Sequence, residues 1–380
     1  MTIHWCGSGL SSIPGLRRLI LEGNDVVVWN RTVKRANNAV GDLTNNIRTF
    51  NKEDIESTLK RGDIIVSMLP GEFHVPIAEL AIAKQANFIS SSYISPQMRE
   101  LNAKAKDSGI SLVNEVGLDP GIDHLMAHKL VEEYRKSKLN SIENDISFIS
   151  YCGGIPKIPN AFKYKFSWSP FGVLKALKSP SKSIRDFKEF NVKRPWHSIS
   201  SYKAPLLKPE SFEVYPNRDS LPFIKQYHFD PLWKIKEFVR GTLRLNGWST
   251  AWKSVFEEIE TLSGIEGEIR LREMSNQFWK ENSYNKDESD RVVLCVSLKA
   301  ERNNTCLWHK TFVMDAWGDK SSTAMARLVS YPVSFAVESI LKNQMPIGVQ
   351  AATDNLTLIS EWLRKIAELA QHFQVIVHKE

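Results

Sequence analysis

Two groups of residues in the 380-residue sequence have side chains suited to chemistry. The first is the turn Asn114–Leu125, NEVGLDPGIDHL, which crowds carboxylates and a histidine around two glycines and a proline. Asp119 and His124 are an acid and a base of the types that transfer protons, although neighbouring turns need not bring them together. The alternative is a helix N-terminus, with Asp119 as the cap, Pro120 at the first helical position and Asp123 in the first turn.

The second group lies further along the chain. Cys152 follows a strand pattern and precedes two glycines, so it is a candidate nucleophile; the alternative is a small buried side chain, because no activating base is visible. Arg218, Arg240 and Arg244 stand among turn-forming residues, where fixed guanidinium groups suit bidentate recognition of carboxylates. The alternative for these arginines is salt bridging at the surface.

The start of the chain predicts a nucleotide-binding unit. Ile3–Cys6 has a strand pattern, a glycine turn follows, Leu16–Glu22 is helical, and Asp25–Trp29 is a β-branched strand. Such a turn lets backbone amides approach a pyrophosphate at a helix N-terminus, although Ser12 occupies the place of the third glycine of the usual fingerprint. The expected cofactor contacts in this turn are Gly7, Ser8, Gly9 and Leu10.

The end of the second strand indicates which cofactor is bound. An acid that binds the ribose hydroxyl is expected here, but the residues present are Asn30, Arg31 and Thr32. These residues leave a 2′-phosphate unopposed and give it a guanidinium partner, so they favour NADP, with NAD kept open. Arg31 stacking on adenine, or a solvated surface role, is the alternative.

The remaining pattern predicts the fold class. Strands and helices alternate up to Val116, which indicates a Rossmann-type doubly wound parallel sheet, with ligands at the carboxyl ends of its strands. Beyond the Asn114 turn we expect a second, α+β substrate domain with a small helical insert, whose tryptophans form a core rather than a surface for stacking bases. The expected boundaries are 1–124 for the nucleotide domain, 125–344 for the substrate domain, about 231–285 for the insert, and about 345–380 for a chain end that packs back on the first domain.

Composition narrows the class of partner. The formal charge is +7 and the pI near 9.0, but the basic residues are spread along the chain, which favours anionic small ligands over nucleic acid. The four cysteines show no metal-ligand spacing, so no metal site is expected, and no apolar run is long enough to cross a membrane. We therefore expect a cytoplasmic protein with reduced thiols, for which a homodimer is left open.

Seven stretches extend these inferences by resemblance. In chain order they are SSYISPQMREL (Ser91–Leu101), NEVGLDPGIDHL, SYCGGIP (Ser150–Pro156), YKFSWSP with GVL (Tyr164–Leu174), YPNRDSLP (Tyr215–Pro222), FVRGTLR (Phe238–Arg244) and AMARLVSYPVSFAVE (Ala324–Glu338). Together they resemble the saccharopine dehydrogenase (saccharopine reductase) family over most of the chain. The resemblance implies interconversion of saccharopine with L-glutamate and 2-aminoadipate 6-semialdehyde, in lysine metabolism, by hydride transfer to NADP and hydrolysis of an imine.

The resemblance also implies site residues. Asp119 and Cys152 are the catalytic candidates; Ser92, Tyr93, Phe166, Arg218, Arg240 and Arg244 are expected at the substrate, and Ser67 and Leu69 join the cofactor contacts. One departure is Phe171, which stands where the family has an arginine. Two alternatives stay open: a related imine or amine oxidoreductase acting on another N-carboxyalkyl amino acid or polyamine conjugate, and a catalytically silent NADP-binding sensor.

Overall fold

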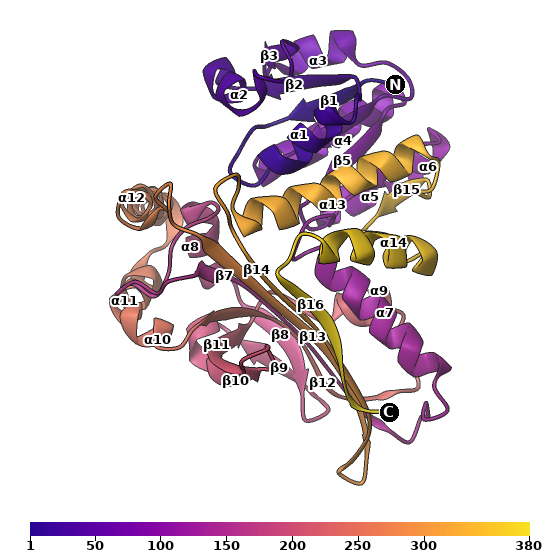
Figure 1. Ribbon diagram of the computed structural model, residues 1–380, viewed down its shortest axis with the longest axis vertical. Helices are drawn as coiled ribbons and strands as arrows, with labels where there is room; N and C mark the ends of the chain where they lie inside the picture. Colours follow the sequence, from indigo (N-terminus) through magenta and orange to yellow (C-terminus); the bar gives the residue numbers. More distant parts are fainter. The chain divides into compact units, whose positions relative to one another are not determined.

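The computed structural model describes all 380 residues, and the chain divides into two compact units. The first unit comprises Met1–Leu125 and Ala326–Ile366; the second comprises Met126–Met325 and Ala367–Glu380. The division falls inside three helices, α7 (Ile122–Lys136), α13 (Ala324–Leu341) and α14 (Leu356–Ala367), so each unit is assembled from two separate segments of the chain (Figure 1).

The first unit is built on a seven-stranded parallel sheet. Its strands are β1 (Ile3–Cys6), β2 (Val26–Asn30), β3 (Ile47–Thr49), β4 (Ile64–Ser67), β5 (Asn87–Ser90), β6 (Ser111–Val113) and β15 (Gly348–Gln350), in the order β15-β6-β5-β4-β1-β2-β3. Reversal of the strand order beside β1 is the arrangement that binds dinucleotides at the carboxyl edge. The predicted Rossmann-type sheet is therefore confirmed.

Helices connect these strands and supply the rest of the core. They are α1 (Ile13–Leu21), α2 (Val33–Val40), α3 (Lys52–Thr58), the 3₁₀ turn η1 (Gly71–Phe73), α4 (His74–Lys84), α5 (Pro96–Glu100) and α6 (Asn102–Asp107). Every residue of β1 and β4 is buried, as expected of strands covered on both faces. Trp29, Ile65 and Phe88 belong to one core cluster with residues of α4 and α6.

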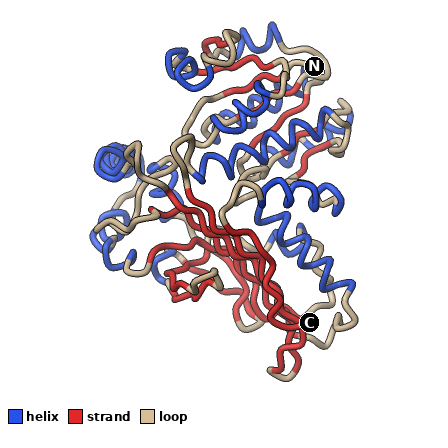
Figure 2. The backbone as a smooth tube through the Cα atoms, in the orientation of Figure 1, coloured by secondary structure: helices blue, strands red, loops and turns tan.

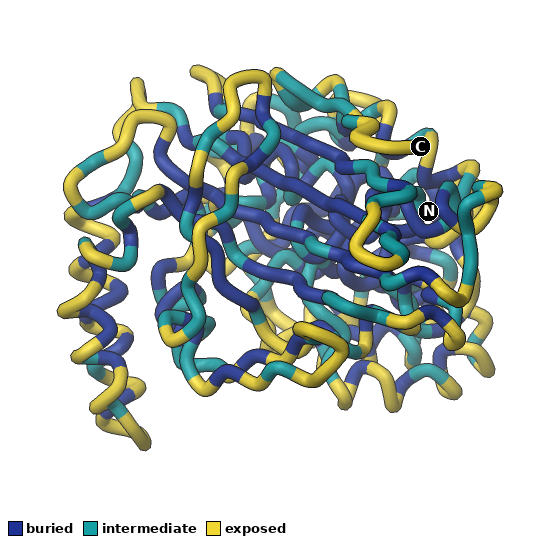
Figure 3. Tube along the Cα trace, turned by 90° about the horizontal axis from the view of Figure 1, so that it is seen from below, coloured by how far each residue is buried: buried dark blue, intermediate teal, exposed yellow.

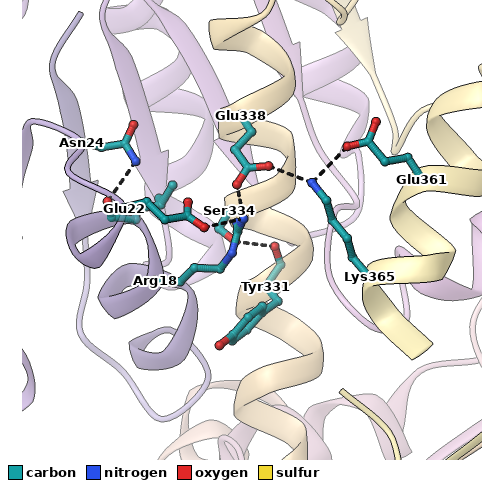
Figure 4. A network of polar contacts seen from close by, with 9 residues as sticks. Arg18, Glu22, Asn24, Tyr331, Ser334, Glu338, Glu361 and Lys365 are labelled. Atoms are coloured by element: carbon teal, nitrogen blue, oxygen red, sulfur yellow. Dashed lines mark hydrogen bonds and ion pairs between the residues drawn. The ribbon is translucent and has the colours of Figure 1, made fainter. Parts of the chain in front are cut away.

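The second segment of the first unit is held against the first by close contacts. The backbone of Gly15 in α1 touches α13 so tightly that an added Cβ would overlap the carbonyl oxygen of Ser330, whose Oγ accepts a 2.8 Å hydrogen bond from Gly15 N. Figure 4 shows the ion-pair network beside this contact: Glu338 of α13 pairs with Arg18 of α1 and with Lys365 of α14 (Leu356–Ala367), the latter at 3.0 Å. The returning helices are thus part of the nucleotide-binding unit.

The second unit contains a mixed sheet of nine strands. They are β7 (Asp145–Pro156), β8 (Ser181–Arg185), β9 (Lys188–Val192), β10 (Ser200–Ala204), β11 (Glu210–Pro216), β12 (Lys234–Leu245), β13 (Asp290–Arg302), β14 (Thr305–Trp317) and β16 (His372–Lys379). The main path is β10-β11-β12-β7-β13-β14-β16, and only β12 and β7 pair in parallel. Figure 2 shows the long strands of this sheet in red. The long central strands are mostly buried, whereas the loops between them are exposed (Figure 3).

Helices that range from one turn to the long α12 complete the second unit. They are α8 (Pro170–Lys178), the 3₁₀ turn η2 (Pro195–Ser198), α9 (Pro222–Gln226), α10 (Trp248–Ala251), α11 (Lys253–Thr261) and α12 (Gly264–Asn282). Trp248 and Trp252 are completely buried in an aromatic core shared by α8, α11 and α12. Trp279 differs from them, because it lies on the exposed face of α12 and is 37% exposed.

Two sequence predictions need correction. The predicted helical insert of about 231–285 begins too early, because Lys234–Leu245 is strand β12; its helices start at Trp248. The chain end of about 345–380 was assigned to the first unit; residues up to Ile366 do lie there, but the rest belongs to the second unit, where β16 pairs with β14. A register shift between Ile235 and Glu237 breaks the alternation that would have marked β12 as a strand, and the partner of β16 lies about 60 residues earlier in the chain.

Candidate functional site

The glycine turn after β1 has the geometry that a pyrophosphate requires. Gly7 has φ +102° and donates to the carbonyl of Trp29 at 2.8 Å; a Cβ here would lie 2.7 Å from the carbonyl oxygen of Met68. A Cβ on Gly9, in contrast, would meet nothing within 4 Å, so the backbone is open to a ligand there. Ser8 Oγ is buried without a hydrogen-bond partner in the same turn. Helix α1 begins just beyond, with its N-terminus available to an anion.

The residues after β2 lie beside this turn. Asn30 Oδ1 accepts a 3.1 Å hydrogen bond from Ser8 N, and its Nδ2 donates to the carbonyl of Thr32 at 2.8 Å. Asn30 thereby ties the glycine turn to the N-terminus of α2, where Arg31 is exposed. No carboxylate follows β2 where a ribose-binding acid would stand, so these residues fit the 2′-phosphate of NADP. Leu10 is 41% exposed at the edge of the turn.

Two other predicted cofactor residues are placed differently. Ser67, the last residue of β4, has no exposed surface, and its hydroxyl lies 2.9 Å from His74 Nδ1. Ser67 therefore acts on any ligand through its neighbours, because burial prevents direct contact in this conformation. Leu69 is half-buried and packs on the core cluster beside the position of Gly7.

A hydrogen-bonded chain leads from Ser67 to the loop after β5. His74 Nε2 lies 2.8 Å from Ser92 Oγ, so the imidazole bridges two serine hydroxyls. Burial lowers the pKa of His74 to about 4, so the ring is neutral at physiological pH. Ser92 and Tyr93, both predicted at the substrate, are half-buried in this loop and remain accessible.

Asp119 lies at the tip of the turn in the stretch Asn114–Leu125. The turn closes on itself through hydrogen bonds from Gly117 N to Pro120 O at 2.9 Å and from Ile122 N to Gly117 O at 3.0 Å. Asp119 Oδ1 accepts a 3.0 Å hydrogen bond from the hydroxyl of Tyr93. Helix α7 begins at Ile122, so Pro120 precedes the helix instead of occupying its first position, and Asp119 is not its cap.

His124 has the structural role that its surroundings dictate. It is completely buried, with Nε2 at 3.0 Å from Glu115 Oε2 and Nδ1 at 3.5 Å from Asp123 Oδ2. Glu115 Oε1 accepts a 2.9 Å hydrogen bond from Ile94 N, and Glu115 N donates to Ser92 O at 3.0 Å. His124 thus supports the same loop through Glu115.

In the second unit, one face of the sheet carries the predicted cysteine and two arginines. Register pairs Cys152 with Thr242 of β12, and because alternate residues of a strand share a face, Arg240 and Arg244 lie on the same side. Cys152 is 8% exposed and Arg240 3% exposed; the Arg240 guanidinium lies 4.0 Å from the centre of the Phe223 ring. Arg244 lies four residue steps along the strand from Arg240, which separates the two by roughly 13 Å.

Arg244 is a buried guanidinium among aromatic rings. Its guanidinium carbon lies 4.7, 5.5 and 5.8 Å from the ring centres of Tyr164, Trp248 and Tyr215. Its Nε has no hydrogen-bond partner, and Tyr164 Oη and Trp248 Nε1 are also buried without partners. The titratable groups that act on it are two tyrosines and a cysteine, and none is a carboxylate. Such a cation is costly to bury unless an anion joins it.

The other predicted substrate residues of this unit occupy two different environments. Arg218 is exposed, with φ +56°, in the loop after β11, where its carbonyl accepts from Lys182 N at 2.8 Å. Phe166 is 1% exposed and packs between Tyr164 and Phe278 in the helical core, so its ring offers no surface to a ligand. Phe171, the departure from the family pattern, packs at the edge of this core with Arg272 4.3 Å from its ring centre.

Sequence reasoning missed several residues of these regions. His74 has no sequence signal, because the two hydroxyls that it joins lie 7 residues before it and 18 residues after it. Trp248 was assigned only to a core and Tyr164 only to a family stretch, although both lie beside Arg244. The only sequence signal for this arrangement is the high number of aromatic residues near Tyr164 and Trp248, whose rings can pack around a cation.

Comparison with protein families agrees with both units. Residues 3–113 match the "Saccharopine dehydrogenase NADP binding domain", and residues 117–369 match the "Saccharopine dehydrogenase C-terminal domain". The chain belongs to the saccharopine dehydrogenase family. The match to the family's NADP-binding domain lies within the first segment of the first unit and confirms the cofactor prediction.

Named relatives share part of their length with the chain. It is 35% identical over 252 residues to "Saccharopine dehydrogenase [NADP(+), L-glutamate-forming]" of Pyricularia oryzae, with 64% of this chain and 54% of that protein aligned. For the protein of the same name from Saccharomyces cerevisiae, the identity is 34% over 261 residues, covering 66% and 56%. The chain spans about half the length of the curated relatives it matches.

Solved structures support the fold. The apo saccharopine dehydrogenase (L-Glu forming) of Saccharomyces cerevisiae superimposes with a TM-score of 0.79 over 99% of both chains at 24% identity. The homospermidine synthase of Legionella pneumophila superimposes with a TM-score of 0.64 at 10% identity, covering 100% of this chain and 92% of that one. At these identities the matches show the fold alone. No helix combines the length and hydrophobicity needed to cross a membrane.

Proposed function

We propose that the protein is an NADP-dependent saccharopine dehydrogenase of the L-glutamate-forming type. In the oxidative direction, the methylene carbon that joins the lysine half of saccharopine to the secondary amine loses a hydride to NADP. Water then adds to the resulting imine. The adduct then collapses to L-glutamate and 2-aminoadipate 6-semialdehyde. The reaction requires a protein that binds several carboxylates, positions the amine and excludes bulk water.

The observation that carries this proposal is the environment of Arg244. A buried guanidinium without a carboxylate partner destabilises the ligand-free protein, so its presence is best explained by an anionic ligand. The surrounding rings and the unpartnered Tyr164 hydroxyl favour a carboxylate that accepts hydrogen bonds from several donors. A polyamine, whose ammonium groups Arg244 would repel, fits this environment less well.

Residues of the first unit have two roles in the proposed reaction. The glycine turn, Asn30, Arg31 and the N-terminus of α1 hold the cofactor, whose nicotinamide ring accepts the hydride when bound. Asp119, held by the Tyr93 hydroxyl, orients the amine or the attacking water. In the second unit, Cys152 lies on the same sheet face as Arg240 and Arg244, as a candidate group at the substrate.

A direct assay tests the proposal. Absorbance of NADPH and NADH is followed with saccharopine in one direction, and with L-glutamate plus the semialdehyde in the other. We expect turnover in both directions, with a KM for NADP at least about tenfold below that for NAD. Tight NADP binding without turnover of saccharopine would favour the silent sensor, and turnover only of other N-carboxyalkyl amino acids would favour the related oxidoreductase.

The cellular setting is also a proposal. Four free cysteines, three of them buried, support a reducing compartment such as the cytoplasm. The expected partner is a small molecule with several carboxylates, and nucleic acid and membranes are not expected partners. A homodimer is tested by light scattering of the purified protein at several concentrations.

A further inference from the structure

The contact between Ser67, His74 and Ser92 joins three elements of the first unit. Ser67 ends β4, His74 begins α4, and Ser92 lies in the loop after β5. The imidazole lies within hydrogen-bond distance of both hydroxyls, at 2.9 and 2.8 Å, and packs edge-on against Phe88. The packing leaves the ring 6% exposed and fixes both nitrogens.

The donor and acceptor atoms of a neutral imidazole determine which group donates in each hydrogen bond between Ser67, His74 and Ser92. A neutral imidazole has one N–H donor and one accepting nitrogen. The Ser67 hydroxyl is fully buried, and His74 is its side-chain partner, so its proton is satisfied by donation to Nδ1. The ring proton then sits on Nε2 and is donated to Ser92 Oγ. With its oxygen occupied in this way, Ser92 has its own hydroxyl proton free to donate outward.

Other contacts fix the loop but leave this hydroxyl to His74. Glu115 N holds the carbonyl of Ser92, Glu115 Oε1 holds Ile94 N, and Ser92 N donates to Ser90 Oγ at 3.0 Å. These bonds position the backbone of Ser92, and none of them reaches its Oγ. The orientation of the hydroxyl therefore depends on the imidazole alone among the protein groups.

We propose that His74 is a positioning residue, which fixes Ser92 as a hydrogen-bond donor to an anionic group of the substrate. The proposal rests on the proposed function, because it takes the substrate to be a polycarboxylate. Donation by Ser92 suits a carboxylate oxygen, which can only accept. Ser67 is the buried anchor that selects the ring tautomer.

A matched pair of substitutions tests this role. The amide of H74N occupies the region of Nδ1, so it keeps the contact with Ser67 and falls short of Ser92. The longer amide of H74Q reaches the region of Nε2 and can donate to Ser92. We expect H74N to raise the KM for saccharopine about tenfold, with kcat within about threefold and the KM for NADP unchanged, whereas H74Q stays within about threefold of wild type in all three.

The substitution S92A separates positioning from general damage. It should raise the KM for saccharopine as much as H74N does. The double variant H74N/S92A should have the same KM as S92A alone, because both substitutions remove the same hydrogen bond to the substrate. Equal KM values for H74N and wild type, or effects of H74N and S92A that multiply in the double variant, would overturn the proposal.

A second measurement does not depend on turnover. The tautomer of His74 is read by long-range ¹H–¹⁵N NMR of protein labelled in histidine, with H74N used to assign the signal. We expect a neutral ring protonated on Nε2 at pH 7, and a rising population of the Nδ1–H form in S67A. A wild-type ring protonated on Nδ1, or an imidazolium, would overturn the inference even if saccharopine proved to be a substrate. Failure of the enzyme to turn over saccharopine would instead count against the proposed function.

Discussion

At the scale of single residues, the predicted site residues differ in how much of their surface is accessible to a ligand. Asp119 and Ser92 keep some exposed surface, whereas Ser67 and Phe166 have at most 1%. Arg244 is the unusual case, because it is almost as buried as the core yet carries a full charge with no carboxylate beside it. A side chain of this kind lowers the stability of the free protein in return for a strong interaction with an anion.

Replacing Arg244 with methionine tests whether this side chain lowers the stability of the ligand-free protein and strengthens binding of an anionic substrate. R244M keeps much of the apolar volume among Tyr164 and Trp248 and removes the charge, so the ligand-free protein should unfold at the same temperature as wild type or a higher one. The KM for saccharopine should rise at least about thirtyfold, because a desolvated charge pair is lost. The measurements are thermal unfolding without ligands and steady-state kinetics.

A surface arginine gives the matched control for this variant. Arg272 lies against Phe171 and pairs with Glu268 at 2.7 Å in α12, so R272M removes an exposed ion pair and a cation–π contact at the surface. Its KM should stay within twofold of wild type. A large loss of stability in R244M with an unchanged KM would show that Arg244 serves the fold and not the substrate.

At the scale of elements, the glycines of the first strand-turn-helix unit have distinct tasks. Gly15 allows α1 to touch α13, and a methyl group there must displace the Ser330 backbone; we expect G15A to cost about 2 kcal/mol of unfolding free energy. Gly9 faces open space, so G9A should cost less than about 0.5 kcal/mol and weaken NADP binding about tenfold. Chemical unfolding and fluorescence titration with NADPH distinguish the two, and equal losses of stability would contradict this assignment.

Strand β16, the last strand of the second sheet, contacts β14 through a pair of stacked histidines. The rings of His309 in β14 and His378 in β16 stack at 4.1 Å, with Ser297 and Thr311 bonded to them at 2.9 and 3.0 Å. Burial lowers the pKa of His309 to about 4 and also lowers that of His378; His378 and Lys299 add repulsion at His309, which Glu301 offsets in part. Both rings are therefore neutral in the folded protein at pH 7.

This pair makes stability depend on pH in a definite direction. Because the folded pKa lies below the unfolded value near 6.5, the stabilisation is complete above pH 6.5 and is lost as the pH falls toward 4. Since the rings are partly exposed, we expect a loss of about 1 kcal/mol. In urea unfolding between pH 7 and pH 4.5, H309Q should lose less stability than wild type. Parallel pH profiles for the two proteins would refute the assignment.

Prediction of elements from the sequence succeeded where local pattern decides the structure. The apolar runs of β1 and β4 and the glycine turn between β1 and α1 were visible because neighbouring residues specify them. Strand β12 was misread, because the register shift at Ile235 and Glu237 disturbs the alternation and its buried face carries Arg240 and Arg244. Two charged residues on the buried face hide the apolar alternation by which a strand is recognised.

At the scale of the whole molecule, the chain order does not follow the division into units. Residues 326–366 complete the first unit, which cannot be inferred from local pattern because contacts such as Gly15 to Ser330 and Arg18 to Glu338 span more than 300 residues. Strand β15 also pairs with β6, whose outer edge would otherwise be open. The nucleotide-binding unit is therefore incomplete until nearly all of the chain has been synthesised.

This arrangement predicts how fragments behave. Residues 1–125 alone lack α13, α14 and β15, so they should be poorly folded, without a cooperative thermal transition and without NADPH binding. The same fragment joined to residues 326–366 by a Gly/Ser linker of about 20 residues, which spans roughly 25 Å, should recover both properties. Introducing G15A into the fusion should abolish that recovery, because it blocks the contact of α1 with α13. Cooperative folding of residues 1–125 on their own would show that residues 326–366 are not needed for the first unit to fold.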